Sequence, residues 1–490
     1  MIARQRGEHA VERRRFSRPV DRTAERDRVI AVVGGGASGT LAAVHLLRAG
    51  HVRVMLIDPG RHGLGVAYST NDERHLLNVR AAAMGGLADE PEDFLRWCRG
   101  RGLGAEPDDY LPRRLYGAYL QDLLTRFGER TRLRFICARV QNVLEPPNHS
   151  GVRMTLSDGR VLSADAVVLA LGNPSPATLE QVSPSCHAAF IRDPWAPEAI
   201  HRASGALRVA ILGSGLTAVD VALSVLDSNP AAEVSAISRH GWLPRAHLPG
   251  PAPAPNALAL HGGCSLERIL QTVTAATAAA PGQWRTVLDG LRPITTELWQ
   301  GLTAAERERF ERELRPYWDA HRHRVAPAIG ARLASQIQDG HIEIHAGRIT
   351  AYAEDIDGVE VTYRDRESRQ LERLRVDGVI NCTGPESDCR NVDDPLLTNL
   401  IRQKLARPDS LFLGLEVSPE GALIDAHGAA SNLLYAIGPV RKGSLWETIA
   451  VPELRVQVSE LSRLFVAVSK EEDAKREEHC AAVVGLLEHV

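Results

Sequence analysis

One stretch decides the fold of this 490-residue chain: Val29-Ile-Ala-Val-Val-Gly34-Gly-Gly36-Ala-Ser-Gly39. A β-branched apolar run passes directly into glycines spaced G-x-G-x-x-G, which is typical of a strand, a tight turn and a helix. The first glycine permits the turn, the second lets the backbone approach a pyrophosphate, and the third lets helix and strand pack closely. The turn residues that we expect at a dinucleotide are Gly34, Gly36, Ala37, Ser38 and Gly39.

A second copy of the pattern follows about a domain length later, in Val209-Ala-Ile-Leu-Gly213-Ser-Gly215-Leu-Thr-Ala218. Alanine at the third position is tolerated by this fingerprint. Two such turns, each in strand-turn-helix context, imply two dinucleotides on one chain and predict an α/β protein with two Rossmann-like dinucleotide-binding domains. The residues expected at the second dinucleotide are Gly213, Ser214, Gly215, Leu216 and Thr217.

The residues that end the next strands distinguish the two turns. The strand Val52 to Ile57 ends in Asp58, and an acid at this spacing can hydrogen-bond a ribose hydroxyl. After the second turn, the corresponding strand is followed by Arg239, which would attract a 2′-phosphate that a carboxylate would repel. This difference favours NADPH over NADH, and the alternative is that Arg239 is a solvated surface arginine.

A repeated phrase predicts how the domains are connected. The stretches 165–172 and 377–384 both begin with Asp, continue as a buried parallel strand and end in a glycine turn. The pair suggests that the chain crosses twice between domains, so that the second domain is inserted in the first. The expected divisions are a disordered tail over 1–27, the first dinucleotide-binding domain over 28–205 and 375–490, and the second over 206–374.

A helical subdomain is expected within the second domain, over residues 257–338. It follows a proline-rich linker and ends in the basic and aromatic run from Tyr317 to Arg324. We interpret it as a cap over the site, and the alternative is a surface helix whose cations are solvated.

Composition narrows the class of protein. The chain is 44% hydrophobic and has a formal net charge of −3, so it can form more than one core and offers no electrostatic case for nucleic acid. No apolar run approaches the roughly 18 residues of a membrane span, and the arginine-rich N-terminal stretch lacks the apolar segment of a secretory signal. We therefore expect a cytoplasmic protein whose partner is a small molecule, not a nucleic acid or a membrane.

Cysteine and histidine spacing argues against three other chemistries. None of the seven cysteines forms a C-x-x-C pair, and the nearest pair is Cys382 and Cys389, which predicts free thiols and no disulfide reductase. His321 and His323 are two residues apart and would point to different sides of a helix, so no metal site is expected. The turn at Gly213 departs from the G-x-S-x-G of hydrolases.

Two further stretches carry a family resemblance. They are Gly63-Leu-Gly65-Val-Ala-Tyr-Ser-Thr with the following run from His75 to Met84, and the C-terminal run from Gly438 to Arg455. They resemble bacterial FAD/NAD(P)-binding proteins that include an FAD-dependent urate hydroxylase, and they are similar to the two-dinucleotide flavin monooxygenases. The resemblance implies FAD at the first turn, with the helix beginning near Thr448 approaching the flavin. Many flavoproteins place an acid after the glycine of the last turn, whereas this chain has Pro439, which leaves the ribityl contact unassigned. Beyond the turn itself, the residues expected at FAD are Asp58, Gly65, Asn78, Met84, Val140, Gly384, Gly438 and Thr448.

The resemblance also implies a function. NADPH would reduce FAD, and a flavin C4a-hydroperoxide formed with molecular oxygen would hydroxylate a small polar molecule, either urate or an amino acid or amine. Two alternatives stay open: an NAD(P)H-dependent flavin oxidoreductase or oxidase without oxygen insertion, and a redox sensor without catalysis. The substrate-side candidates are Arg322, His321, Asn78, Arg80 and Trp446.

Overall fold

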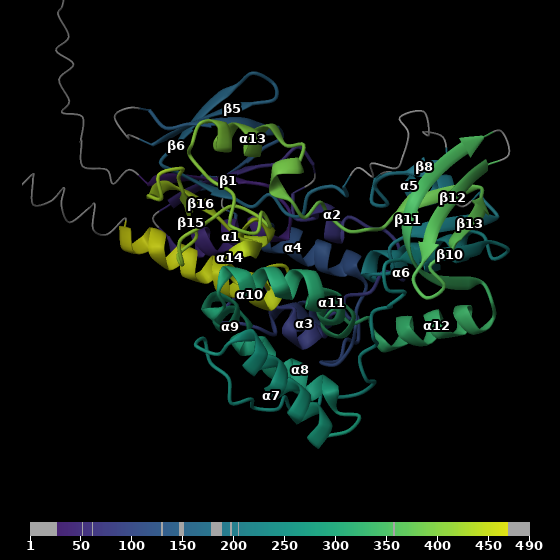
Figure 1. Ribbon diagram of the computed structural model, residues 1–490. Coiled ribbons are helices and arrows are strands. Elements are labelled where there is room, and N and C mark those ends of the chain that lie inside the picture. Colours follow the sequence, from purple (N-terminus) through teal and green to yellow (C-terminus); the bar gives the residue numbers. More distant parts are fainter. Residues whose placement is uncertain are drawn as a thin grey trace, which may run out of the picture.

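The computed structural model describes residues 27–50, 52–60, 62–128, 131–146, 151–177, 189–196, 198–203, 205–355 and 358–468. The tail predicted over 1–27 lies outside these residues, apart from its last position. Two sheets dominate the structure, with a group of helices beside them (Figure 1).

The first sheet has the strand order β15-β16-β7-β1-β2-β3 and is parallel except for β15. Alternate side chains of β1 enter different cores. Ile30 and Val32 pack with α1 (Ala37–Ala49), α3 (Asp93–Gly100), α4 (Arg113–Phe127) and the helix over residues 451–468. Ala31 and Val33 pack with α13 (Pro395–Arg402) and the small antiparallel sheet β4-β5-β6. Both faces are therefore covered, as a parallel sheet requires. The strands are β1 (Arg28–Val33), β2 (Val52–Ile57), β3 (Leu133–Ile136), β4 (Val140–Leu144), β5 (Val152–Leu156), β6 (Val161–Ala164), β7 (Ala166–Leu169), β15 (Ala422–Ile424) and β16 (Ala430–Ala436).

The second sheet has the order β13-β12-β11-β10-β9-β14-β8, and its five strands from β11 to β8 run parallel. Val209 and Ile211 of β9 pack against α6 (Leu216–Ser228) and α12 (Pro327–Gln338). Ala210 and Leu212 pack toward the antiparallel hairpins of β11, β12 and β13. The strands are β8 (Phe190–Ile191), β9 (Arg208–Leu212), β10 (Glu233–Ser238), β11 (Ile342–Asp355), β12 (Gly358–Asp365), β13 (Leu371–Val376) and β14 (Gly378–Asn381).

The repeated phrase forms equivalent strands in the two sheets. Asp165 precedes β7, and its carboxylate accepts a hydrogen bond of 2.6 Å from the amide of Val29 at the start of β1. Asp377 precedes β14, and its carboxylate accepts one of 2.8 Å from the amide of Arg208 at the start of β9. Each phrase forms the last strand of its sheet before the chain passes to the other sheet, which is the connection that an inserted domain needs.

The second sheet extends beyond the range 206–374. β8 precedes this range and β14 follows it, and the two strands pair with each other beside β9. The helical range 257–338 also divides, because α12 packs on the second sheet through Ile329 and Leu333. In contrast, two separate cores are formed with residues of α7 (Leu266–Ala279), α8 (Trp284–Leu291), α9 (Thr295–Gly301) and α11 (Arg315–Arg322). One of these cores includes Trp446, so this helical group is anchored on the first domain.

The two domains also meet through their helices. Arg113 at the start of α4 forms an ion pair of 2.7 Å with Asp220 of α6, and both side chains are largely buried. His75 Nε2 lies 2.8 Å from the hydroxyl of Ser224 on the same helix. The helices are α1 (Ala37–Ala49), α2 (Gly65–Tyr68), α3 (Asp93–Gly100), α4 (Arg113–Phe127), α5 (Ala199–Ala203), α6 (Leu216–Ser228), α7 (Leu266–Ala279), α8 (Trp284–Leu291), α9 (Thr295–Gly301), α10 (Ala304–Arg309), α11 (Arg315–Arg322), α12 (Pro327–Gln338), α13 (Pro395–Arg402) and α14 (Lys442–Leu445), with a π-helical turn at Phe310–Leu314. None of the described helices combines the length and apolar character that a membrane crossing needs.

Candidate functional site

The first glycine turn is shaped by contacts that exclude side chains. Gly34 has φ +106°, and a Cβ there would lie 2.2 Å from the carbonyl oxygen of Ala170. A Cβ on Gly39 would lie 1.8 Å from the carbonyl oxygen of Gly34, so the first turn of α1 lies directly against the glycine turn. Glycine is required at both positions, and Gly39 acts through packing because it lines neither of the cavities described below.

The N-termini of α1 and α6 have the same open geometry. Gly36 and Gly215 are the N-cap residues, and neither helix has a side-chain hydrogen bond that caps it. A Cβ on Gly36 would meet only Gly65 Cα, at 3.5 Å, and one on Gly215 would meet nothing within 4 Å. Unpaired amide groups of a helix N-terminus beside open space form a site for phosphate groups. Both turns therefore fit a dinucleotide pyrophosphate.

The first cavity has a volume of about 1050 Å³ and runs from the first turn toward the helical group. Asp58 lies at its edge, where its carboxylate accepts hydrogen bonds from the amides of Gly35 at 2.6 Å and Gly60 at 2.7 Å. The residues expected at FAD that line this cavity are Gly34, Gly36, Ala37, Ser38, Asp58, Gly65, Asn78, Met84 and Val140.

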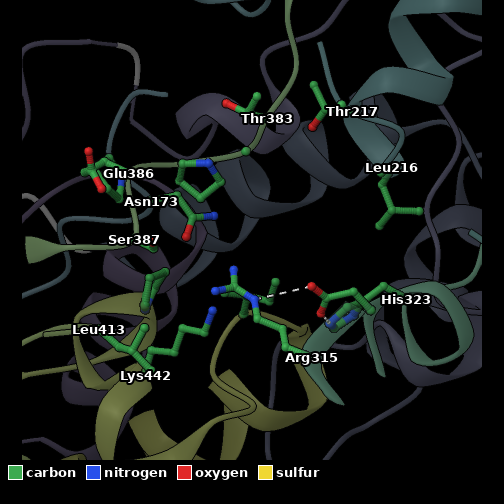
Figure 2. A pocket seen from close by; sticks show the side chains of 18 of the residues that line it. Asn173, Leu216, Thr217, Arg315, His323, Thr383, Glu386, Ser387, Leu413 and Lys442 are labelled. Atoms are coloured by element: carbon green, nitrogen blue, oxygen red, sulfur yellow. Dashed lines mark hydrogen bonds and ion pairs between the residues drawn. The ribbon is translucent and has the colours of Figure 1, made fainter. Parts of the chain in front are cut away.

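The second cavity, of about 770 Å³, surrounds the second turn. Lys442 and Arg315 point into it opposite Thr217 and Leu216 (Figure 2). Its wall includes Arg239, whose side chain is exposed just after β10. All the residues expected at NADPH line it: Gly213, Ser214, Gly215, Leu216, Thr217 and Arg239.

The motif places Ser214 in the phosphate-binding turn, but its hydroxyl is bound to residues of the protein. Its hydroxyl lies 2.6 Å from the carbonyl oxygen of Trp242 and 2.7 Å from the hydroxyl of Ser238. These contacts hold the segment after β10 against the turn. The side chain is therefore used for positioning the loop that carries Arg239.

The two cavities adjoin between the sheets and the helical group. Gly384 and Thr448, both expected at FAD, line the second cavity and not the first. Gly438 lines neither, because it is buried, its amide donates to Gln457 Oε1, and a Cβ there would lie 2.8 Å from Ser38 Oγ. The residues that line both cavities are Leu171, Gly172, Asn173, Leu216, Thr217, His323, Asp394, Pro439, Glu447 and Ile449.

Of the basic candidates for the substrate side, Arg322 alone has a side chain directed to this junction. It lines the first cavity, and its Nη2 lies 3.3 Å from Glu447 Oε2. Arg80 also lines the first cavity, but its guanidinium bonds Asp108 and the carbonyl oxygen of Gly250, so it holds a loop. His321 lines neither cavity, because it lies on another side of α11 and its Nδ1 contacts the carbonyl oxygen of Tyr317.

Asn78 and Trp446, the other two candidates, both line a cavity. Asn78 lines the first, and its carbonyl oxygen lies 3.2 Å from His247 Nε2. Trp446 lines the second, and its ring packs on Trp299 and Phe310 with centroids 4.8 and 5.0 Å apart. The indole thus joins the helical group to the wall of the site.

The backbone at Trp446 is strained. This residue has φ 63° and ψ −62°, and the amide of Glu447 donates a 2.8 Å hydrogen bond to the carbonyl oxygen of Leu445. These features define a γ-turn of the rare form with positive φ. Such strain costs about 1–3 kcal/mol and is found mainly at functional sites. The helix that was expected from Thr448 begins at residue 451, after this turn.

Several residues of the site were not anticipated. His323 lies at the junction, where burial lowers the pKa of its imidazole. Lys442 lines the second cavity 4.9 Å from the Trp446 ring, and burial lowers its pKa as well. Arg324, which bonds Asp289, lines the first cavity. The basic run up to Arg324 signalled part of this set, but nothing in the sequence singled out Glu447 or Lys442.

Two of the described cysteines lie at the second cavity, where burial disfavours their thiolate forms. All five are free thiols, and Cys382 and Cys389 both line the second cavity. Burial raises the pKa of Cys382 and raises that of Cys389 to about 12, which disfavours the thiolate that disulfide exchange needs.

Comparisons with known proteins agree with this architecture. Residues 31–174 match a family model described as FAD-NAD(P)-binding. No curated protein matches the chain. Among solved structures, the chain is similar to the reduced form of ornithine hydroxylase from Pseudomonas aeruginosa, with TM-score 0.61, 18% identity, and coverage of 90% of this chain and 99% of the other. The chain has the fold of the two-dinucleotide-binding flavoenzymes.

Two further structures show the same likeness. The ornithine N-hydroxylase from Kutzneria sp. 744, described with reduced FAD, NADP⁺ and L-ornithine, gives TM-score 0.61 at 14% identity over 91% of this chain and 99% of the other. A cadaverine monooxygenase from Erwinia amylovora bound to FAD gives TM-score 0.57 at 17% identity over 89% of this chain and 93% of the other.

Proposed function

We propose that the protein is an FAD- and NADPH-dependent monooxygenase that hydroxylates a small amine. The observation that carries this proposal is the junction, where two cavities built around separate glycine turns share a wall. Such an arrangement allows two cofactors and a small molecule to meet between the domains. The likeness to ornithine and cadaverine hydroxylases supports an amine as substrate, in preference to urate.

The first cavity would hold FAD. The amides at the N-terminus of α1 face the open space at Gly36, and Asp58 lies where it can reach a ribose. Met84 and Val140 provide apolar wall further along. FAD supplies the electron transfer and oxygen chemistry of such enzymes when it is bound.

The second cavity would hold NADPH. The N-terminus of α6 faces the open space at Gly215, and Arg239 follows β10 at the position suited to a 2′-phosphate. Arg348 lines the same cavity and adds positive charge. A guanidinium group can bind a phosphate through two parallel hydrogen bonds, which gives preference for NADPH over NADH.

The helical group would keep water from the junction. Trp299 and Trp446 are buried, and Trp299 Nε1 donates a 2.8 Å hydrogen bond to the carbonyl oxygen of Gly443, which ties α9 to α14. Arg292 binds Glu453 at 2.7 Å and fastens the same group to the helix over 451–468. An enclosed site favours transfer of oxygen to the substrate over loss to water.

The test is NADPH consumption in air by the purified yellow protein, with hydrogen peroxide measured in parallel. Ornithine, lysine, cadaverine and urate are supplied one at a time. We expect one amine to accelerate NADPH loss while the yield of peroxide falls below the NADPH consumed and a hydroxylated product forms. A peroxide yield equal to the NADPH consumed with every compound would indicate an oxidase. Bound flavin without NADPH turnover would indicate a redox sensor. A peroxide yield that falls below the NADPH consumed with urate alone would identify urate as the substrate.

A further inference from the structure

Glu447 occupies an unusual place in the site. Its side chain is only 6% exposed, yet it lines both cavities at their junction. The strained γ-turn centred on Trp446 presents it there. A carboxylate that is buried in this way needs partners for both oxygens, because an unpaired buried charge is costly.

Glu447 has only half of the partners that it needs. Arg322 Nη2 reaches Oε2 at 3.3 Å, but Oε1 is buried and accepts no hydrogen bond within the described part of the chain. Arg322 Nε is likewise buried without a partner there. The junction therefore holds one unfilled acceptor next to a guanidinium group.

Several other carboxylates that line the cavities are bound to groups of the protein. Asp58 accepts two backbone amides, and Asp394 caps the N-terminus of α13. Asp220 is paired with Arg113, and Asp289 with Arg324. Asp394 and Glu447 are the two carboxylates that line both cavities, and of these two only Glu447 has a buried oxygen that accepts no hydrogen bond from a described residue.

The surrounding charges determine which group fits this oxygen. Arg292 is bound to Glu453 through two hydrogen bonds, and Lys442 lines the neighbouring wall without a hydrogen bond to any described residue. Neither of these cations binds Oε1 of Glu447, and an N–H donor that carries positive charge is the strongest hydrogen-bond complement of this oxygen.

We propose that Glu447 is the residue that binds the ammonium group of the amine substrate, with Oε1 as the acceptor and Arg322 as the group that holds the carboxylate in place. This inference rests on the proposed function and assigns to one side chain the selection of amines over urate. A neutral amide edge such as that of urate offers weaker N–H donors to a carboxylate.

The experiment compares wild type with Glu447→Gln, Glu447→Asp and, as a matched control, Glu453→Gln. Glu453 is also paired with an arginine but lines neither cavity. Cadaverine, ornithine, lysine and urate are titrated, without NADPH, against the thermal unfolding midpoint and the flavin absorbance spectrum. Flavin content and NADPH oxidation without amine verify that each variant is folded and loaded.

We expect at least one amine to raise the unfolding midpoint of wild type, and Glu447→Gln to weaken its apparent affinity roughly ten- to a hundredfold, because the neutral amide loses the charge-assisted bond. Glu447→Asp should recover part of the affinity, and Glu453→Gln should change it less than threefold. In turnover, the loss should appear in the KM for the amine while the NADPH KM stays constant.

Three results would overturn the assignment: no amine binding by wild type, equal weakening in Glu447→Gln and Glu453→Gln, or urate binding that depends on Glu447 when amine binding does not. Failure of the proposed function is a separate result. If amine binding requires Glu447 but peroxide still equals NADPH consumed, the site assignment stands and the monooxygenase proposal fails.

Discussion

Gly34 and Gly213 lie at matching points of the two sheets. They have φ +106° and +112°, and each backs onto the carbonyl oxygen of the neighbouring strand, at Ala170 and Cys382. The amides of Gly34 and Gly213 also donate hydrogen bonds of 2.8 Å to the carbonyl oxygens of Ile57 in β2 and Ile237 in β10. The similarity shows that the turn backbone is determined by the strand-turn-helix unit itself and is independent of which cofactor the turn receives.

The turns differ one helical turn further along. Gly39 lies so close to Gly34 that it has no room for a side chain, whereas Ala218 stands at the matching position and is buried with its methyl group in the core. The helix of the second turn therefore stands slightly farther from its glycines. The two also differ beyond the next strand, where Asp58 is bound to backbone amides and Arg239 is exposed.

The largest expected effect is from exchanging the third residue of each turn. Gly39→Ala places a methyl group 1.8 Å from the carbonyl oxygen of Gly34, so we expect a loss of about 2–3 kcal/mol in the free energy of unfolding and loss of bound FAD. Ala218→Gly removes a buried methyl group and should cost only about 1 kcal/mol, with FAD retained. Urea denaturation and flavin absorbance measure both, and equal losses would break the proposed difference between the turns.

Side chains placed at the N-termini of α1 and α6, at Gly36 and Gly215, should weaken ligand binding but leave folding intact. Gly36 and Gly215 have extended backbones, with φ −73° and −79°, and room for a side chain. Gly36→Val should give colourless protein with its unfolding midpoint close to that of wild type prepared without FAD. Gly215→Val should stay yellow while the KM for NADPH rises about a hundredfold, equivalent to about 2.7 kcal/mol. Retention of flavin by the first variant would contradict the assignment of FAD to this turn.

A smaller effect is expected at Arg239, the residue that follows the strand after the second glycine turn. Arg239→Ala should raise the KM for NADPH roughly ten- to a hundredfold and leave that for NADH nearly unchanged, if the guanidinium binds the 2′-phosphate. Arg373→Ala is a suitable control, because Arg373 lies on β13 with its side chain 72% exposed and lines neither cavity. Equal changes for both nucleotides would remove the reason to prefer NADPH.

The local units of the fold could be predicted from the sequence. The runs before Gly34 and Gly213 form the strands β1 and β9, and the helices expected after the two turns are α1 and α6. The fold class was confirmed by the likeness to two-dinucleotide flavoenzymes. Less regular stretches were harder to predict, because β3 and β4 are separated by only three residues of the chain but belong to different sheets.

Parts of the candidate site depended on contacts between distant segments. The sequence analysis selected His321 as a candidate, whereas His323 lies at the junction. Side chains two residues apart on a helix point in different directions, and packing decides which of them faces the cavities. Glu447 was part of a recognised stretch, but its pairing with Arg322 joins residues 125 positions apart in the chain. That pairing, and the oxygen Oε1 left without a partner beside it, depend on the tertiary structure.

The sequence by itself determined two strand-turn-helix units and the residues that end their following strands, because turn geometry and strand periodicity are local properties of the chain. Only the tertiary structure decided that β8 and β14 join the second sheet, that α12 separates from the other helices, and that the two cavities share a wall. These features arise from pairing and packing between residues far apart in the chain, where each contact depends on the position of all the others.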